Sequence, residues 1–301
     1  MHPLEPLGPD EIAAAVARLR QDARVGSRSR FVCVNLLEQD KDLILARAEE
    51  QVERQTLAVL LDNATGGTYE AIVSLTSGAI TSWEHKPGMQ PGIMLDEFFE
   101  AEEALKKDPL FQEALRKRGV TNFDLIMVDP WAAGNYGAKE ENERRVIRAL
   151  TWVRSEAKDN GYARPVEGLM ALVNLNEMKL VGLEDTGVVP FPPTPGNYSR
   201  DYIKDYRQDL KPLQITQPEG PSFQVNRHEV TWQKWKLRIG FTRREGLVLH
   251  TITYEDGGKE RPLIYRASLS EMVVPYSDPH QNSFRKNAFD VGEYGIGMLP
   301  H

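Results

Sequence analysis

A proline-rich stretch divides this chain and limits how it can fold. Residues 187–221 hold seven of the 19 prolines, and these flank a tyrosine-rich segment at 197–209. Because proline fixes φ and lacks a backbone N–H, such a stretch cannot form the interior of a helix or a central strand. The sequence therefore predicts an extended linker between two differently patterned parts of the chain.

Residues 1–87 are predicted to form a small α+β domain. Pro9-Asp10-Glu11 is a typical helix start, and apolar residues follow at the spacing of one helix face. Runs rich in β-branched and apolar residues, separated by glycine-containing turns, then predict strands at 30–37, 56–61, 69–75 and 79–84. A helix that precedes several short strands favours one helix packed on an antiparallel sheet, as in cystatins.

Residues 88–186 repeat this plan. One helix is expected from near Met94, where apolar residues follow at helical spacing, and a second is expected from Asp108-Pro109 to Gly119. Strands are predicted at 123–128, 145–153, 168–174 and 179–184. The aromatic segments 129–131 and 134–137 are interpreted as a long loop, which could be structural or could line an interface.

Residues 222–301 have a β pattern. Trp235, Leu237, Ile239 and Phe241 alternate with more polar residues, which predicts a strand with this apolar face buried. Further strands are expected at 248–254 and 261–274, giving three or four in all. These are too few to cover the large aromatic side chains, so the region is interpreted as the truncated start of an all-β sandwich. The predicted fold class is thus α+β, with two small domains followed by that start.

The composition of the chain argues against some classes of partner. The formal net charge of −7 argues against nucleic acid or an anionic membrane as the main partner. Cys33 is the only cysteine, which excludes an internal disulfide, and its apolar neighbours predict a packed strand residue. No secretory signal pattern and no apolar run of membrane-spanning length are present, so a cytoplasmic location is expected.

Asp290 is the candidate for catalysis. It lies between Phe289 and Val291, shortly before Gly292. A carboxylate with apolar neighbours loses solvation, which raises its pKa and suits it to accept protons near neutral pH. A turn aspartate that accepts backbone N–H bonds has the same pattern, and spacing alone favours that structural interpretation.

Several segments resemble the copper amine oxidase family, whose members use topaquinone to oxidise primary amines to aldehydes. The resemblance lies in Tyr276-Ser277-Asp278-Pro279 and in residues 235–241, 261–272 and 287–295. It covers nearly the whole chain, since the two α+β units are similar to the family's N2 and N3 domains before its catalytic β-sandwich. The resemblance implies oxidative deamination by dioxygen, which yields aldehyde, ammonia and hydrogen peroxide.

The resemblance also implies roles for individual residues. Asp290 matches the aspartate that removes a proton from the substrate carbon, and Ala288 matches a gate position at the end of the amine channel. Tyr294 matches an aromatic residue near the quinone. The whole segment matches the family's substrate-contact residues, here Ala288, Phe289, Val291, Gly292, Glu293, Tyr294, Gly295, Ile296, Gly297, Met298 and Leu299.

The family implies copper and topaquinone as cofactors, but the sequence motifs that provide them in the family do not occur in this sequence. The quinone forms from tyrosine in Asn-Tyr-Asp/Glu, but the two Asn-Tyr pairs, at 135–136 and 197–198, precede Gly137 and Ser199. Copper is held by a His-x-His pair and a third histidine, and no two of the six histidines are two apart. No metal ligand is assigned. The chain is therefore expected to be the amino-terminal part of an amine oxidase, inactive alone.

Other interpretations stay open. The two α+β units could form a non-catalytic binding or dimer-partner module. The family forms homodimers largely through its catalytic sandwich, which leaves dimerisation of this chain open. Some eukaryotic members are peroxisomal, so a full-length eukaryotic relative could be too.

Overall fold

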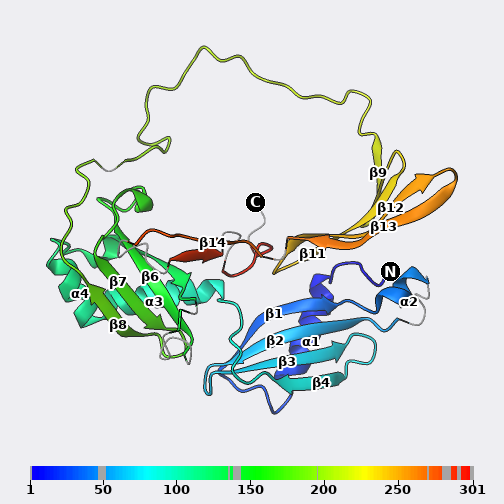
Figure 1. The fold of residues 1–301 in the computed structure, drawn as a ribbon, viewed down its shortest axis with the longest axis horizontal. Coiled ribbons are helices and arrows are strands. Elements are labelled where there is room, and N and C mark those ends of the chain that lie inside the picture. The colour runs from blue at the N-terminus through cyan, green and yellow to red at the C-terminus, as the bar shows by residue number, and fades with distance from the viewer. Residues whose placement is uncertain are drawn as a thin grey trace. The chain divides into compact units, whose positions relative to one another are not determined.

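The computed structural model describes residues 2–46, 52–134, 136–137, 144–194, 196–269, 271–279, 286–289 and 293–298. The chain forms two compact units. The first unit comprises Met1–Gly92, Thr216–Met272 and Tyr294–His301, and the second comprises Ile93–Ile215 and Val273–Glu293. Figure 1 shows the elements of both.

The first unit opens with a helix on an antiparallel sheet of order β1-β2-β3-β4. Helix α1 begins where predicted, because Pro9 fits the first helical turn and Glu11 accepts the Gly8 N–H at 2.8 Å. Its apolar face supplies Ala15 and Leu19 to the core, and the helix lies across one face of the sheet (Figure 1). These elements are α1 (Pro9–Arg20), β1 (Ser29–Leu37), α2 (Lys41–Leu45), β2 (Gln55–Asp62), β3 (Gly67–Ser74) and β4 (Ile80–His85).

The second unit contains an antiparallel sheet of order β5-β6-β7-β8 with two helices. Asp108 caps the second helix as predicted, since its carboxylate accepts the N–H groups of Leu110 and Phe111 at 2.9 and 3.0 Å. The elements are α3 (Leu95–Lys107), α4 (Pro109–Arg116), η2 (Phe123–Leu125), β5 (Ile126–Ala132), β6 (Val146–Val153), η3 (Gly161–Ala163), β7 (Leu169–Asn174) and β8 (Lys179–Asp185).

The prediction of a loop at 129–131 is wrong. Asp129, Pro130 and Trp131 belong to β5 and pair with β6, with Pro130 opposite Ala149. A proline is tolerated here because β5 is an edge strand, so the side that lacks a donor needs no partner. The predicted strand at 123–128 is correspondingly shifted, since its first three residues form η2.

The linker and the sheet after it come next in the chain. Among the described residues between Asp185 and Phe223, neither helix nor strand occurs, as the prolines predicted. The first unit then adds a sheet of order β13-β12-β11-β10-β9, so its five strands exceed the three or four expected. They are β9 (Phe223–Asn226), β10 (Glu229–Trp232), β11 (Trp235–Thr242), β12 (Gly246–Asp256) and β13 (Lys259–Ser268).

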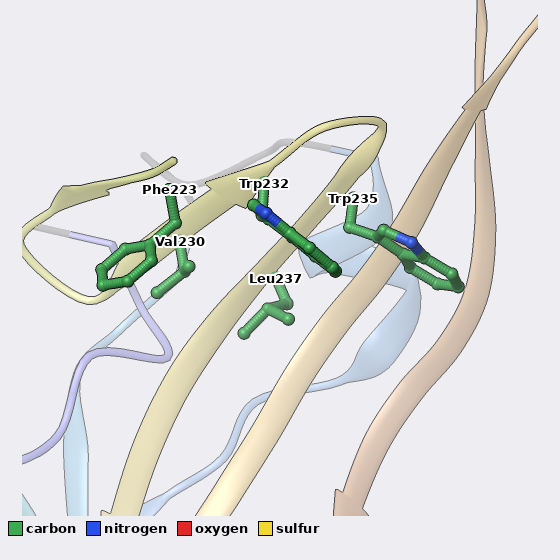
Figure 2. Close-up of a pocket in the computed structure, with 5 residues that line it drawn as sticks. All are labelled: Phe223, Val230, Trp232, Trp235 and Leu237. Atoms are coloured by element: carbon green, nitrogen blue, oxygen red, sulfur yellow. The ribbon is translucent and has the colours of Figure 1, made fainter. Parts of the chain in front are cut away.

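The face of this sheet that was expected to be buried is largely exposed. Trp232 pairs with both Phe223 and Trp235, so the three aromatic side chains lie side by side on one face (Figure 2). With Val230 and Leu237 they line an apolar groove of about 510 Å³, and Trp232 remains 47% exposed. Within the part of the chain that the structure describes, no second layer covers this groove.

The fold class is confirmed as α+β, with helix-on-sheet domains followed by an all-β region. A two-stranded ribbon of β14 (Val273–Pro275) and β15 (Asn287–Phe289) completes the second unit. The described helices include none that is long and apolar enough to cross a membrane.

Candidate functional site

Strand β15 carries two of the predicted site residues. It pairs antiparallel with β14, so that Ala288 lies opposite Val274 and Phe289 opposite Val273. Ala288 is only 7% exposed, and β15 contacts β5. The predicted base, Asp290, lies outside the described residues, as do Val291, Gly292 and Leu299.

One face of the β14–β15 ribbon meets aromatic side chains. The Tyr276 N–H donates to the Lys286 carbonyl at 2.9 Å, which extends the ladder by one residue beyond the strands. Because alternate residues of a strand share a face, Lys286 lies on the same face as Ala288, with Tyr276 and Val274 opposite them. Trp131 of β5 contacts Tyr276, with ring centroids 5.7 Å apart.

An ammonium group lies against these rings. The Lys286 Nζ is 4.2 Å from the centroid of the Trp131 ring and 4.8 Å from that of Tyr276, within the range of a cation–π interaction. Burial lowers the pKa of Lys286, while the nearby Asp129 carboxylate opposes this shift. Burial also raises the pKa of Asp129, whose carboxylate accepts the Trp131 Nε1–H at 3.0 Å. The second unit thus holds a partly desolvated cation beside an acid.

The remaining predicted residues are divided between the units. Glu293 belongs to the second unit, and Tyr294–Met298 belongs to the first. The latter segment packs against the β11–β12 turn, where the N–H groups of Ile296 and Gly297 donate to the carbonyls of Arg244 and Arg243 at 3.0 and 2.8 Å.

Glycine is required at two of these positions by close backbone approach. A Cβ at Gly297 would lie 2.0 Å from the Thr242 carbonyl oxygen, and one at Gly295 would lie 2.6 Å from that of Arg243. Gly295 also has φ +99°, which disfavours any side chain. The Gly-x-Gly pattern therefore fixes how this segment docks on the turn.

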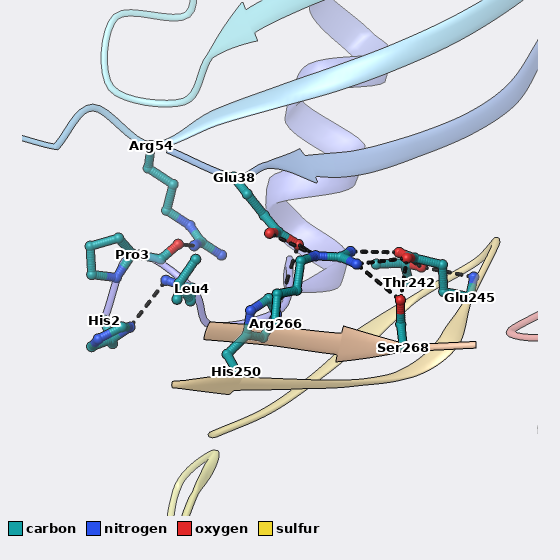
Figure 3. Close-up of polar contacts among 10 residues, drawn as sticks. All are labelled: His2, Pro3, Leu4, Glu38, Arg54, Thr242, Glu245, His250, Arg266 and Ser268. Carbon is teal, nitrogen blue, oxygen red and sulfur yellow. Dashed lines mark hydrogen bonds and ion pairs between the residues drawn. The ribbon is translucent and has the colours of Figure 1, made fainter. Parts of the chain in front are cut away.

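Arg266 holds that turn from the neighbouring strand (Figure 3). Its two terminal nitrogens donate to the two Glu245 oxygens at 2.8 and 2.7 Å, and its Nε donates to Glu38 at 2.9 Å. Ser268 donates to Glu245 at 2.6 Å. The bonds from Arg266 lower the pKa of Glu245 from 4.5 to about 2. Arg266 thereby joins Glu38, the residue that follows β1, to the β11–β12 turn and β13 within the first unit.

The histidines do not form a copper site in the described structure. His250 is a buried residue of β12, its Nε2 is 3.8 Å from Glu38, and burial lowers its pKa. No group of three or more His, Cys, Asp or Glu side chains suited to a metal occurs in those parts of the chain that can be described. Cys33 lies in β1 as predicted, and burial raises the pKa of its thiol.

The sequence patterns did not predict that Trp131, Tyr276 and Lys286 contact one another beside Ala288. A pattern was available for Trp131: Ile126, Val128 and Pro130 are buried alternately along β5, which places Asp129 and Trp131 on the other face. The position of Lys286 over the two rings depends on contact between distant segments, so no local pattern predicts it.

Comparison with known proteins agrees with this architecture. Three family models match successive parts of the chain: "AGAO-like N2 domain" over residues 9–83, "Copper amine oxidase, N3 domain" over 96–204, and "Copper amine oxidase, enzyme domain" over 224–301. The third match includes the segment that holds Ala288 and Asp290.

The chain is also similar to individual amine oxidases along nearly its whole length. The chain is 50% identical over 300 residues to a primary amine oxidase of Arthrobacter sp. (strain P1), covering 99% of this chain and 46% of that protein. It is 38% identical over 344 residues to a tobacco protein named "Diamine oxidase [copper-containing] 1, peroxisomal", covering 100% of this chain and 44% of that protein.

A solved structure shows the same fold. The copper-containing benzylamine oxidase of Hansenula polymorpha superposes with a TM-score of 0.83 at 26% identity, over 99% of this chain and 49% of that one. The chain thus spans about half the length of the relatives it matches. On these matches, the chain belongs to the copper amine oxidase family and corresponds to its amino-terminal part.

Proposed function

We propose that this chain supplies the proton-accepting part of a primary-amine oxidase. In this proposal Asp290 accepts a proton from the carbon that bears the substrate nitrogen, and Ala288 forms part of the passage for the amine. The observation that carries it is the position of Ala288, buried on a ribbon face beside Trp131 and Tyr276, in a segment matched by the enzyme-domain model.

The chemistry requires an acceptor for electrons as well as for the proton. When bound, topaquinone with copper supplies that acceptor. The residues of this chain do not fit either group: neither Asn-Tyr pair precedes an acid, no His-x-His is present, and the described side chains form no metal cluster. We therefore propose that copper and quinone are held by polypeptide other than these 301 residues.

The chain's own residues supply binding and proton transfer. A carboxylate placed among apolar groups has a raised pKa, which brings it closer to that of the carbon acid from which it takes the proton. The rings of Trp131 and Tyr276 cover part of this ribbon face and reduce its contact with water, which strengthens electrostatic interactions there. Substrate contact by Phe289 and by residues 293–298 is part of this proposal. It also includes Val291, Gly292 and Leu299, which lie outside the described residues.

The partners follow from the family. A primary amine and dioxygen are the proposed substrates, with aldehyde, ammonia and hydrogen peroxide as products. The proposed domains are 1–87, 88–186 and 222–301, joined by a linker at 187–221, and the proposed location is cytoplasmic.

A joined protein tests the proposal. Residues 1–301 would be fused to the part of the Arthrobacter enzyme that lies beyond its match to this chain. We expect the fusion to form the quinone with copper and to release peroxide from methylamine, and we expect Asp290→Asn to form the quinone without turnover.

Each other outcome contradicts the proposal. Turnover by the Asp290→Asn fusion would exclude Asp290 as the base. A quinone-containing fusion without turnover, or failure to form the quinone where the parent enzyme forms it, would favour a non-catalytic binding or dimer-partner module.

A further inference from the structure

Lys286 is the only described cation on the ribbon face that carries Ala288. Its Nζ lies against the rings of Trp131 and Tyr276, which are the groups that an incoming alkylammonium would otherwise contact. The Tyr276 N–H bond to its carbonyl fixes its backbone in the ladder, so the ammonium cannot leave the face without a change of side-chain rotamer.

The position of this charge relates it to the proposed passage. Lys286 precedes Ala288 by two residues on the same face and precedes Asp290 by four in sequence. Partial burial reduces screening by water, so the charge acts over several ångströms more strongly than at an open surface. A substrate that contacts this face of the ribbon therefore lies near a positive charge.

We propose that Lys286 is a specificity-determining residue that selects primary monoamines with uncharged tails over diamines. This inference rests on the proposed function. Every primary amine carries one reacting nitrogen, but a diamine carries a second ammonium that must enter the same passage. Lys286 occupies the aromatic faces that would stabilise this second ammonium and repels it.

Asp129 modulates the selection in the opposite sense. Its carboxylate acts electrostatically on Lys286 and is bonded to the Trp131 indole, so it offsets part of the lysine's charge. Removal of the lysine and removal of the acid should therefore change the selectivity in opposite directions. If the substitutions only loosened the packing around Trp131, the selectivity of both variants would change in the same direction.

The test uses the fusion described above, with butylamine and 1,4-diaminobutane as matched substrates. The quantity measured is kcat/KM for butylamine divided by kcat/KM for 1,4-diaminobutane. Lys286→Met should lower this ratio roughly fivefold, because a unit charge several ångströms away in partly buried surroundings contributes at least that much. Lys286→Glu should lower it further, Asp129→Asn should raise it, and Lys286→Arg should preserve it.

Two controls separate charge from packing. Lys179→Met removes a solvent-exposed lysine from β8 of the same unit and should leave the ratio unchanged. Added salt should reduce the ratio of the parent fusion and have little effect on that of Lys286→Met, because salt screens the lysine's charge.

A ratio that stays within about twofold in both Lys286→Met and Lys286→Glu would overturn the inference. A change in the same direction in Lys286→Met and Asp129→Asn would also overturn it, since that pattern indicates packing. If one of Lys286→Met, Lys286→Glu and Asp129→Asn fails to form the quinone, the ratios of the other two variants decide. Failure of the proposed function itself is recognised separately, by turnover in Asp290→Asn or by absence of turnover or of the quinone in the fusion without substitutions.

Discussion

Arg266 and Glu245 form a two-pronged ion pair, with both terminal guanidinium nitrogens donating to the carboxylate at 2.8 and 2.7 Å. The same arginine also bonds Glu38, at the end of the first small sheet. Since Glu245 lies in the turn on which Tyr294–Met298 docks, the pair connects the stability of the first unit to a segment with proposed substrate contacts.

Replacement of Arg266 should destabilise the first unit. Arg266→Met leaves two partly buried carboxylates without their cation, which we expect to cost about 2 kcal/mol in the free energy of unfolding. Urea denaturation of the 301-residue chain measures this cost. Arg261→Met is the matched control in the same strand, because its pair with Asp256 is 64% and 54% exposed and should contribute below about 0.5 kcal/mol. Equal effects of the two substitutions would contradict the role given to Arg266.

Stability should fall in acid because of Glu245. Its pKa is lowered in the folded chain from 4.5 to about 2, chiefly by Arg266. A depressed folded pKa means that the contribution is complete above about pH 4.5 and is lost as the pH falls towards 2. Glu245→Gln should therefore show a shallower fall in unfolding free energy across this window than the unmodified chain. Glu113→Gln, at an exposed helix position, should leave the slope unchanged.

The docking of the carboxy-terminal segment should depend on Gly297. A methyl group there would meet the Thr242 carbonyl, so Gly297→Ala must displace the segment and break the 2.8 Å bond to Arg243. We expect the amides of residues 296 and 297 to exchange with solvent at least about tenfold faster. This corresponds to a decrease of roughly 1.4 kcal/mol in the free energy of local opening. Gly26→Ala is the control, since its nearest neighbour is 4.0 Å away. Unchanged exchange in Gly297→Ala would refute this packing.

The stability of the second unit should depend on a buried ion pair between Glu97 and Arg145. Glu97 is 0% exposed and Arg145 4%, joined by bonds of 3.0 and 2.7 Å, and Glu97 also accepts the Met94 N–H at the start of α3. Glu97→Gln removes the charge that Glu97 contributes to this buried pair, which should cost about 3–5 kcal/mol. Glu103→Gln, whose partner Lys107 is exposed, should cost less than about 0.5 kcal/mol. A loss below 1 kcal/mol at Glu97, measured by thermal or urea unfolding, would show that this pair is not a main source of stability.

Local sequence patterns predicted most elements, because caps and side-chain alternation act over a few residues. Pro9 and Asp108 marked helix starts, and the linker followed from its prolines. Pro130 misled the prediction of β5, since whether a strand lies at an edge is a property of the sheet.

The candidate site was predictable only in part. The roles of Ala288 and Asp290 came from family resemblance, and Asp290 lies outside the described residues. Contacts between distant segments had no local pattern: Lys286 meets Trp131 where β15 contacts β5, and Arg266 bonds Glu38 from 228 residues away. Such contacts follow from the tertiary fold.

The most direct test of the central claim is peroxide release from methylamine by the purified 301-residue chain, incubated aerobically with copper, beside the fusion protein. We expect peroxide and quinone absorbance from the fusion and neither from the chain alone, because Asp290 has no electron acceptor there. Amine-dependent peroxide from the isolated chain would contradict it.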